Sequence, residues 1–258
     1  MKDIFSMWSN TRMIVLTAIC AALYAGLMLP FKIAPIIPGF SELRPGAAIP
    51  LTCSLLFGPA AAWGAGIGNV IGDIWGGMIG PGSFFGFIGN FLMAYIPYKF
   101  WQILNSKADM ELSSSNDNDN DNNKLKSISV FILICITASF ACAVFVGWGL
   151  DIIKLVPLRI LANVIAINNS IFTIFLGLPL TLALYKRVKQ WGLFYADIMT
   201  GPQADSMRGT KHVTPISRLG ALMMVFSTIG GMIALNLGFK NPGFSVFILL
   251  MIIASFLL

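Results

Sequence analysis

Apolar residues along this chain of 258 residues gather into long runs that carry almost no charge. The clearest runs are Met13–Pro30, Ile128–Leu150 and Ile160–Tyr185. An α-helix needs about 20 apolar residues to cross a hydrocarbon core of about 30 Å, and helices follow because unpaired backbone groups are not tolerated in lipid. The short alternating segments typical of a membrane β-barrel are absent. The pattern therefore predicts an all-α integral membrane protein.

The apolar segments predict eight spanning helices, six of them in one block up to Tyr185 and two after a hydrophilic gap. Their expected ranges are 13–30, 46–57, 59–78, 83–104, 128–150, 157–185, 219–238 and 243–258. The first is expected to be a retained span, because it is longer than the apolar region of a signal peptide.

The hydrophilic segments divide the chain further. We expect a six-span core at residues 1–191, a cytoplasmic linker at 192–217 and a C-terminal two-helix hairpin at 218–258. Within the core, residues 106–126 contain the tract SSSNDNDNDNN. This tract has nothing to bury, so it predicts a disordered linker.

Composition agrees with membrane residence and predicts an orientation. Only 11% of the residues are charged, against about 25% in soluble domains. If the N-terminus lies inside, internal segments hold 12 of the 17 lysines and arginines and external segments hold 5. This positive-inside asymmetry predicts a multi-pass protein of the cell membrane with both termini in the cytoplasm. It also accounts for the net charge of +6 without a nucleic-acid partner.

Motifs for catalysis and for cofactors are missing from the sequence. There is no phosphate-binding loop, no H-E-x-x-H and no nucleophile elbow. The four cysteines lie inside apolar runs and form no Cys-x-x-Cys pair, so neither a metal nor another cofactor is expected. The chain is not expected to be an enzyme. If it drives uptake against a gradient, the energy must come from a partner or from an ion gradient.

Glycines recur every fourth residue in the third predicted span, and small residues also recur in the first. Stripes of this kind let helix backbones approach closely in a membrane. Asn69 and Asp73 lie beside the glycine stripe and share a helix face. Asp73 is the one acidic residue expected within a span, so it either lines a site or has a structural role. The glycines of the stripe are Gly64, Gly68, Gly72 and Gly76. In the first span, spacing alone does not decide whether the small face packs internally or on another subunit.

Polar residues that could bind a ligand occur in three further places. The proline-rich loop Phe31–Gly46 is too polar to span and carries charges of both signs, so it could cap a cavity. Polar residues of the fourth and sixth spans should face the bundle, where they either bond other helices or contact a polar ligand. The candidates are Glu42 and Arg44 in the loop, Asn90 in the fourth span, and Arg159, Asn163 and Asn169 in the sixth.

Three short stretches carry a family resemblance. ELRPGAAIPL (Glu42–Leu51), LFGP (Leu56–Pro59) and GIGNVIGD (Gly66–Asp73) resemble the substrate-binding S component of energy-coupling factor (ECF) transporters, over about residues 12–190. The resemblance implies a six-helix bundle that binds a vitamin or related micronutrient in an outward-facing cavity closed by the loop after the first span. It also implies a coupling membrane subunit and an ATPase pair as partners, with Ala18, Ala22 and Ala25 facing the coupling subunit.

The polar linker and the final hairpin are additions to the six-span pattern of this family. No motif in the sequence identifies one substrate.

Two other classes of function remain open. A stand-alone secondary transporter should show inverted repeats with broken helices, and the two short I-G-N matches do not establish a repeat. A LytS-like sensory module should continue into an output domain, whereas this chain is expected to end in the membrane.

Overall fold

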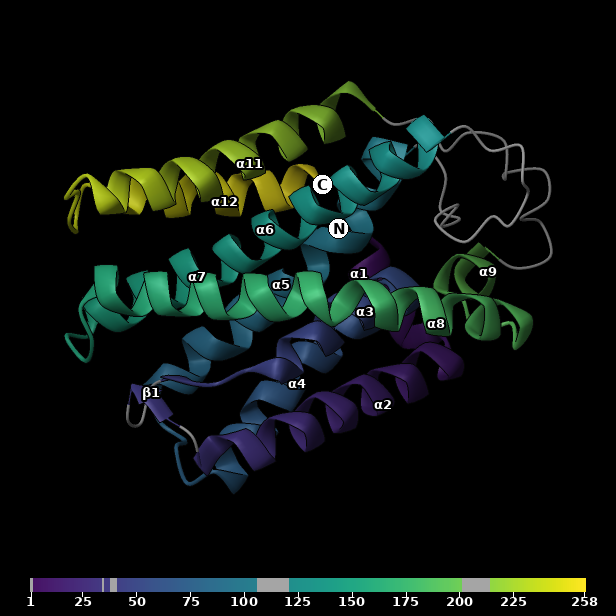
Figure 1. Ribbon diagram of the computed structural model, residues 1–258, viewed down its shortest axis with the longest axis horizontal. Coiled ribbons are helices and arrows are strands. Elements are labelled where there is room, and N and C mark those ends of the chain that lie inside the picture. The colour runs from purple at the N-terminus through teal and green to yellow at the C-terminus, as the bar shows by residue number, and fades with distance from the viewer. Residues whose placement is uncertain (1, 34, 38–40, 106–120, 201–213) are drawn as a thin grey trace.

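The computed structural model describes residues 2–33, 35–37, 41–105, 121–200 and 214–258 (Figure 1). These residues form a helical bundle with one short antiparallel strand pair in a connecting loop. In chain order the elements are α1 (Lys2–Ser6), η1 (Met7–Ser9), α2 (Thr11–Met28), η2 (Leu29–Ile33), β1 (Pro35–Ile37), β2 (Ser41–Glu42), η3 (Pro45–Ala47), α3 (Ala48–Phe57), α4 (Pro59–Trp75), α5 (Pro81–Asn105), α6 (Asp121–Ile152), α7 (Leu158–Phe175), α8 (Gly177–Gln190), α9 (Tyr195–Thr200), α11 (Pro215–Asn236) and α12 (Ser245–Leu257).

Four helical segments in the described residues are long and apolar enough to cross a membrane. They are Thr11–Lys32, Leu125–Ile152, Leu158–Phe175 and Pro215–Asn236. Large apolar side chains also cover the outside of the bundle, for example Phe175, Leu222 and Leu237. A surface of this kind suits lipid, which is as apolar as these side chains. The predicted all-α membrane fold is confirmed.

Helices α2 and α4 pack closely along the glycine stripe of α4. A Cβ atom on Gly64 would lie 2.5 Å from the Cβ of Cys20, and one on Gly68 would lie 2.8 Å from the carbonyl oxygen of Ala21. Neither position has room for a side chain, so the two backbones meet as small-x-x-x-small pairs do in membranes. The stripe continues toward the loop after α2 with Gly72 and Gly76.

Helix α5 contains a proline in its interior, and α3 supplies a hydrogen-bonding group at that point. Pro97 has no N–H and disturbs the helical hydrogen-bond ladder. The hydroxyl of Ser54 donates to the carbonyl oxygen of Ala94 and accepts from the N–H of Tyr98 at 3.1 Å. The inserted hydroxyl satisfies both backbone groups and joins α3 to α5 inside the core.

The sixth predicted span, 157–185, is wrong in one respect, because it is two helices. Helix α7 ends at Phe175, and α8 begins at Gly177. Pro179 lies in the first turn of α8 and lacks the N–H that would continue the ladder of α7. A Cβ atom on Gly177 would lie 2.8 Å from a methyl group of Leu51, so the break also lets α3 approach.

Both predicted linkers need correction at their ends. Of the linker expected at 106–126, residues 106–120 lie outside the described residues, whereas 121–126 already belong to α6. The linker expected at 192–217 begins with a packed segment, since Phe194 and Tyr195 are buried. It ends early as well, because Thr214 caps α11 by accepting from the N–H of Ser217. Buried aromatic residues and a helix cap set these boundaries. The mean hydropathy of a segment detects neither of them.

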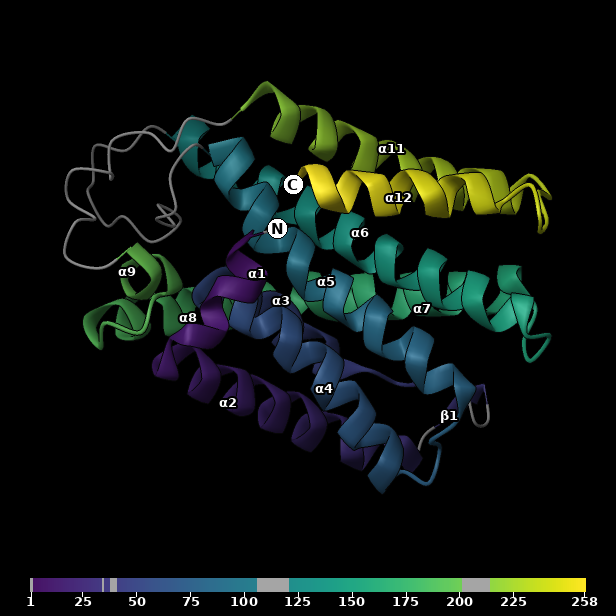
Figure 2. The same ribbon diagram turned by 180° about the vertical axis from the view of Figure 1, so that it is seen from behind.

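The C-terminal hairpin of α11 and α12 packs on α6, with further contacts to α7 and α5. Both views of the ribbon place this hairpin on one side of the bundle and α2 on the other (Figures 1 and 2). The hairpin turn (237–244), the α6–α7 turn (153–157) and the strand pair lie at the same end of the molecule, on the left of Figure 1, which we call the loop end.

Candidate functional site

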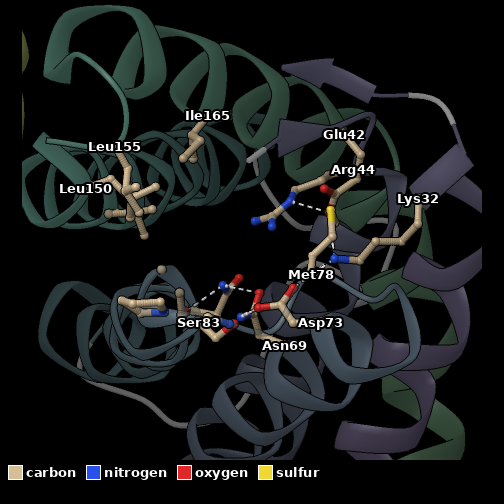
Figure 3. Close-up of a pocket in the computed structure, with 16 residues that line it drawn as sticks. Lys32, Glu42, Arg44, Asn69, Asp73, Met78, Ser83, Leu150, Leu155 and Ile165 are labelled. Atoms are coloured by element: carbon tan, nitrogen blue, oxygen red, sulfur yellow. Dashed lines mark hydrogen bonds and ion pairs between the residues drawn. The ribbon is translucent and has the colours of Figure 1, made fainter. Parts of the chain in front are cut away.

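A cavity with a volume of about 120 Å³ lies at the loop end, between the loop after α2 and helices α4 to α7 (Figure 3). Its lining separates into a polar side and an apolar side. The polar side consists mainly of Lys32, Glu42, Arg44, Asn69, Asp73 and Asn90. The apolar side consists of Val146, Leu150, Leu155 and Ile165 from α6, the α6–α7 turn and α7.

Four charged side chains form a row of alternating sign along the polar side. The ammonium of Lys32 lies 2.8 Å from a carboxylate oxygen of Asp73 and 3.8 Å from one of Glu42. The same Glu42 oxygen accepts from Nε of Arg44 at 3.1 Å. All four residues are largely buried, where unpaired charges would be costly. The row has no net charge, and it ties the loop after α2 to α4.

A second row, of uncharged groups, continues from Asp73 into the bundle. The amide of Asn69 donates to Asp73 at 3.1 Å and accepts from Asn90 of α5 at 3.0 Å. Asn90 in turn accepts from the hydroxyl of Tyr24 of α2 at 2.6 Å. Gly86 makes room for this row, because a Cβ atom there would lie 2.6 Å from the amide nitrogen of Asn69. These bonds fix the amide orientations and join α2, α4 and α5 behind the cavity.

The loop is also held from the other side, by α7. Asn168 donates to the carbonyl oxygen of Glu42 at 2.7 Å and accepts from the N–H of Arg44 at 3.3 Å. One buried amide thus binds the backbone on both sides of Leu43, at the point where β2 leads into η3. The conformation of the loop is therefore coupled to the position of α7.

Arg44 has spare hydrogen-bonding capacity directed into the cavity. Its Nε is bonded to Glu42, and Figure 3 shows its guanidinium extending toward the middle of the space between the two sides. Within the described part of the chain, its two terminal nitrogens have no hydrogen-bond or ion-pair partner. The residue is only 9% exposed. A guanidinium in this position can donate two parallel hydrogen bonds to a planar acceptor.

The structure brings together five of the eight residues that the sequence suggested for a substrate site. Glu42, Arg44, Asn69, Asp73 and Asn90 all line this cavity. The other three, from α7, do not. The residues that lie elsewhere are Arg159, Asn163 and Asn169.

These three side chains of α7 have other surroundings. Arg159 is exposed on the surface. Asn163 exchanges hydrogen bonds with Asn236 of the hairpin, and Asn169 is buried with its amide nitrogen on the sulfur of Met93. Helix α7 carries polar side chains on more than one face, so its polar residues do not all line the same cavity.

Sequence reasoning missed three residues that build the polar side or hold it in place. Lys32 was not among the candidates, because its ion pair with Asp73 spans 41 positions and leaves no local pattern. Tyr24 and Asn168 lie in predicted spans and bond residues 66 and 124–126 positions away, so the local sequence gives no sign of their partners. A lone acidic residue beside a membrane span is a signal that a basic partner should be sought.

The small residues of α2 separate into two faces. Ala18 and Ala22 are exposed, together with Gly26, at which a Cβ atom would meet nothing within 4 Å. Ala25, which was expected on the same outward face, is only 4% exposed and packs inside the bundle. The spacing of 18, 22 and 26 follows one helical stripe, whereas position 25 lies on the next stripe.

Comparison with protein families gives a match. The model of the QueT transporter family matches residues 14–186, which include most of α2, all of α3 to α7, most of α8 and the complete cavity. The C-terminal hairpin lies outside the matched region. No curated protein and no solved structure gives a significant match to the chain.

Proposed function

Because the chain belongs to the QueT transporter family, whose members are S components of ECF transporters, we propose that it binds a queuosine precursor for import. The chain is a multi-pass membrane protein of a transporter and acts on a small molecule. The observation that carries the proposal is the buried guanidinium of Arg44, whose two terminal nitrogens extend into the cavity and have no partner among the described residues.

The size of the cavity supports a small ligand. A bound water needs about 10–15 Å³ of such space, so a volume of about 120 Å³ holds roughly ten non-hydrogen atoms. A free bicyclic base has about this size, whereas a nucleoside carries a whole ribose in addition. We therefore infer that the ligand is the base form of the precursor.

The chemistry of the cavity also supports a planar polar ligand. The two terminal nitrogens of Arg44 can both donate to the carbonyl oxygen on one edge of a base. The opposite side is formed by branched aliphatic side chains, which can cover the face of a ring. The four charges of the polar side sum to zero, so a neutral ligand leaves their balance unchanged.

The loop after α2 forms part of the wall of this cavity. In the structure the loop is attached to α4 through Lys32 and Asp73 and to α7 through Asn168. Release of the loop would break one ion pair and two hydrogen bonds to its backbone. We propose that this loop opens to admit the substrate and closes over it.

Energy for import is proposed to come from other subunits of an ECF complex. The exposed stripe of Ala18, Ala22 and Gly26 on α2 offers a smooth helix face on which a coupling membrane subunit can pack. An ATPase pair bound to that subunit would supply turnover. The distribution of lysine and arginine supports placing both termini in the cytoplasm, with the loop end facing outward.

Ligand binding tests the proposal directly. The full-length protein is purified in lipid nanodiscs, and a radiolabelled queuosine-precursor base is titrated against it beside the nucleoside queuosine. We expect saturable binding of the base and none of the nucleoside. Arg44→Lys should weaken binding by about tenfold or more, because a charged, two-pronged contact is lost while the charge beside Glu42 remains.

Arg159→Lys is the matched control, since it makes the same change on an exposed face outside the cavity. It should bind as tightly as the parent protein. Equal loss in both variants would remove Arg44 from the site. Absence of binding to every queuosine precursor, in a protein that keeps its thermal stability, would overturn the proposed substrate.

A further inference from the structure

The hairpin of α11 and α12 is joined to the bundle by polar contacts that gather at the loop end. Asn236 exchanges hydrogen bonds with Asn163 of α7, at 3.1 and 3.2 Å. Ser245 accepts from the indole N–H of Trp148 of α6 at 3.0 Å, and Asn241 donates to Asp151 at 2.5 Å. Each contact involves a residue within the hairpin turn or at its edge.

Elsewhere along the hairpin the polar groups of the described residues bond mainly to their own helix. Ser227 and Thr228 donate to the carbonyl oxygen of Met224, and Ser255 donates to that of Met251. Within the described residues, the one other side-chain hydrogen bond between the hairpin and the core comes from the hydroxyl of Tyr95, which donates to the backbone carbonyl of Ser255 near the opposite end. If the hairpin only had to pack against the bundle within the lipid, its polar contacts would not need to concentrate at one turn.

Asp151 connects the hairpin to the backbone of the α6–α7 turn. One carboxylate oxygen accepts from the backbone N–H of Leu158, the first residue of α7, at 3.1 Å. The other oxygen accepts from Asn241. Both oxygens of one side chain at the end of α6 are therefore engaged, one by the start of α7 and one by the hairpin.

The same turn carries the apolar side of the cavity. Leu150 immediately precedes Asp151, and Leu155 lies within the turn. Figure 3 shows both leucines across the cavity from Arg44. A shift of this turn would widen or narrow the space that faces the guanidinium.

We propose that the hairpin holds the α6–α7 turn in place and so sets the width of the substrate cavity, with Asn241 and Asp151 as positioning residues. The inference rests on the proposed binding function of this cavity. It assigns a role to the segment that lies outside the family match. The hairpin touches no ligand in this role and acts through the turn alone.

Two measurements on the full-length protein in nanodiscs test the proposal. The first is backbone hydrogen exchange across residues 150–158 without ligand, and the second is the affinity for the radiolabelled queuosine-precursor base. Asn241→Ala should speed exchange in this segment. It should also weaken binding by about twofold to thirtyfold, the range seen for residues that act on a site without contact.

Two control variants separate positioning from general damage. Asp151→Asn keeps one oxygen for the N–H of Leu158 and presents an amide N–H to Asn241, whose side-chain amide can turn so that its oxygen accepts. It should therefore retain nearly the parent's exchange and affinity, whereas Asp151→Ala loses both bonds and should have at least the effect of Asn241→Ala. Tyr95→Phe removes a contact of the hairpin near the opposite end and should leave both measurements unchanged.

Unchanged exchange at 150–158 in Asn241→Ala would overturn the proposal, as would equal effects of Tyr95→Phe. If the parent protein binds no queuosine precursor, the proposed substrate fails, and the exchange measurement still decides whether the hairpin fixes the turn.

Discussion

Acidic residues near the two ends of the bundle are each paired with a lysine that is distant in sequence. At the loop end Asp73 contacts Lys32. At the opposite end Asp3 contacts Lys99 at 2.9 Å and accepts from the hydroxyl of Tyr98. Pairing of this kind offsets the cost of placing charges in apolar surroundings. One lysine–aspartate pair therefore helps to attach the loop after α2 to the bundle, and another helps to attach the N-terminal helix α1.

The attachment of α1 should depend on acid. Burial by itself would raise the pKa of the Asp3 carboxyl, but the attraction of Lys99 outweighs it, and the pKa lies below its ordinary value of 3.8. A carboxylate with a depressed pKa stabilises the folded state above the ordinary value, and this contribution is lost as the pH falls through the lowered one. We expect α1 to stay attached at neutral pH and to loosen below pH 3.8.

Tryptophan fluorescence can follow this change, because the indole of Trp63 donates to the carbonyl oxygen of Ile4 and its ring packs on Trp8. In Asp3→Asn the acid-dependent change should disappear, since no carboxyl remains to titrate there. An identical pH profile in parent and variant would show that another group controls the signal.

The sequence indicated which polar residues could line a site more readily than it indicated which residues they contact. Asp73 and Asn69 were marked by their shared helix face and by the cost of polar groups in a span. Lys32 could not be assigned, because its pairing depends on how the loop folds back over α4. Asn163 and Asn169 could not be separated from the cavity residues, because the sequence does not show that one meets Asn236 of the hairpin and the other meets Met93 of α5.

Helix packing within the bundle depends on where glycines face a backbone rather than on how many there are. Position 64 faces the backbone of α2, because a Cβ atom on Gly64 would lie 2.9 Å from the carbonyl oxygen of Thr17. At Gly72 the nearest atom would be the flexible terminal methyl of Met28, at 3.4 Å. The two positions belong to one stripe and still differ in what a methyl group would meet.

Gly64→Ala and Gly72→Ala should therefore differ in stability. Overpacking against backbone typically costs about 1–3 kcal/mol, so Gly64→Ala should lower the unfolding temperature. Gly72→Ala should be nearly neutral, because Met28 can yield and alanine favours a helix. Thermal unfolding of both variants in one detergent measures the difference. A larger loss in Gly72→Ala would contradict the packing described for α2 and α4.

Elements were predicted well where apolar length alone defines them, as for α2 and α4. Prediction failed where local chemistry ends a helix inside an apolar run. The break at Gly177 depends on Pro179 and on the approach of Leu51, and hydropathy averages across it. The packed segment at Phe194 and Tyr195 was missed because it is too short to form a hydropathy maximum.

The whole molecule has two different sides. The small-residue stripe of α2 faces outward on one side, and the hairpin covers α6 on the other (Figures 1 and 2). A partner can therefore pack on α2 without displacing the hairpin. Association and cavity width are thus expected to be separable properties.

Ala22→Phe tests the proposed partner face. The position is exposed, so a larger side chain should leave the fold and ligand affinity unchanged. It should reduce recovery of the coupling subunit and the ATPase pair in affinity purification, because close helix contact is blocked. Leu222→Phe, on the exposed face of α11, should not. Full recovery of both partners with Ala22→Phe would exclude this stripe as the contact surface.

The row of Asp73, Lys32, Glu42 and Arg44 also has an electrical consequence. Moving one elementary charge through a membrane potential of 100 mV involves about 2.3 kcal/mol, and this work scales with net charge. Two cations and two carboxylates that move together carry none. For a neutral substrate, the membrane voltage then neither drives nor opposes a joint displacement of the four residues.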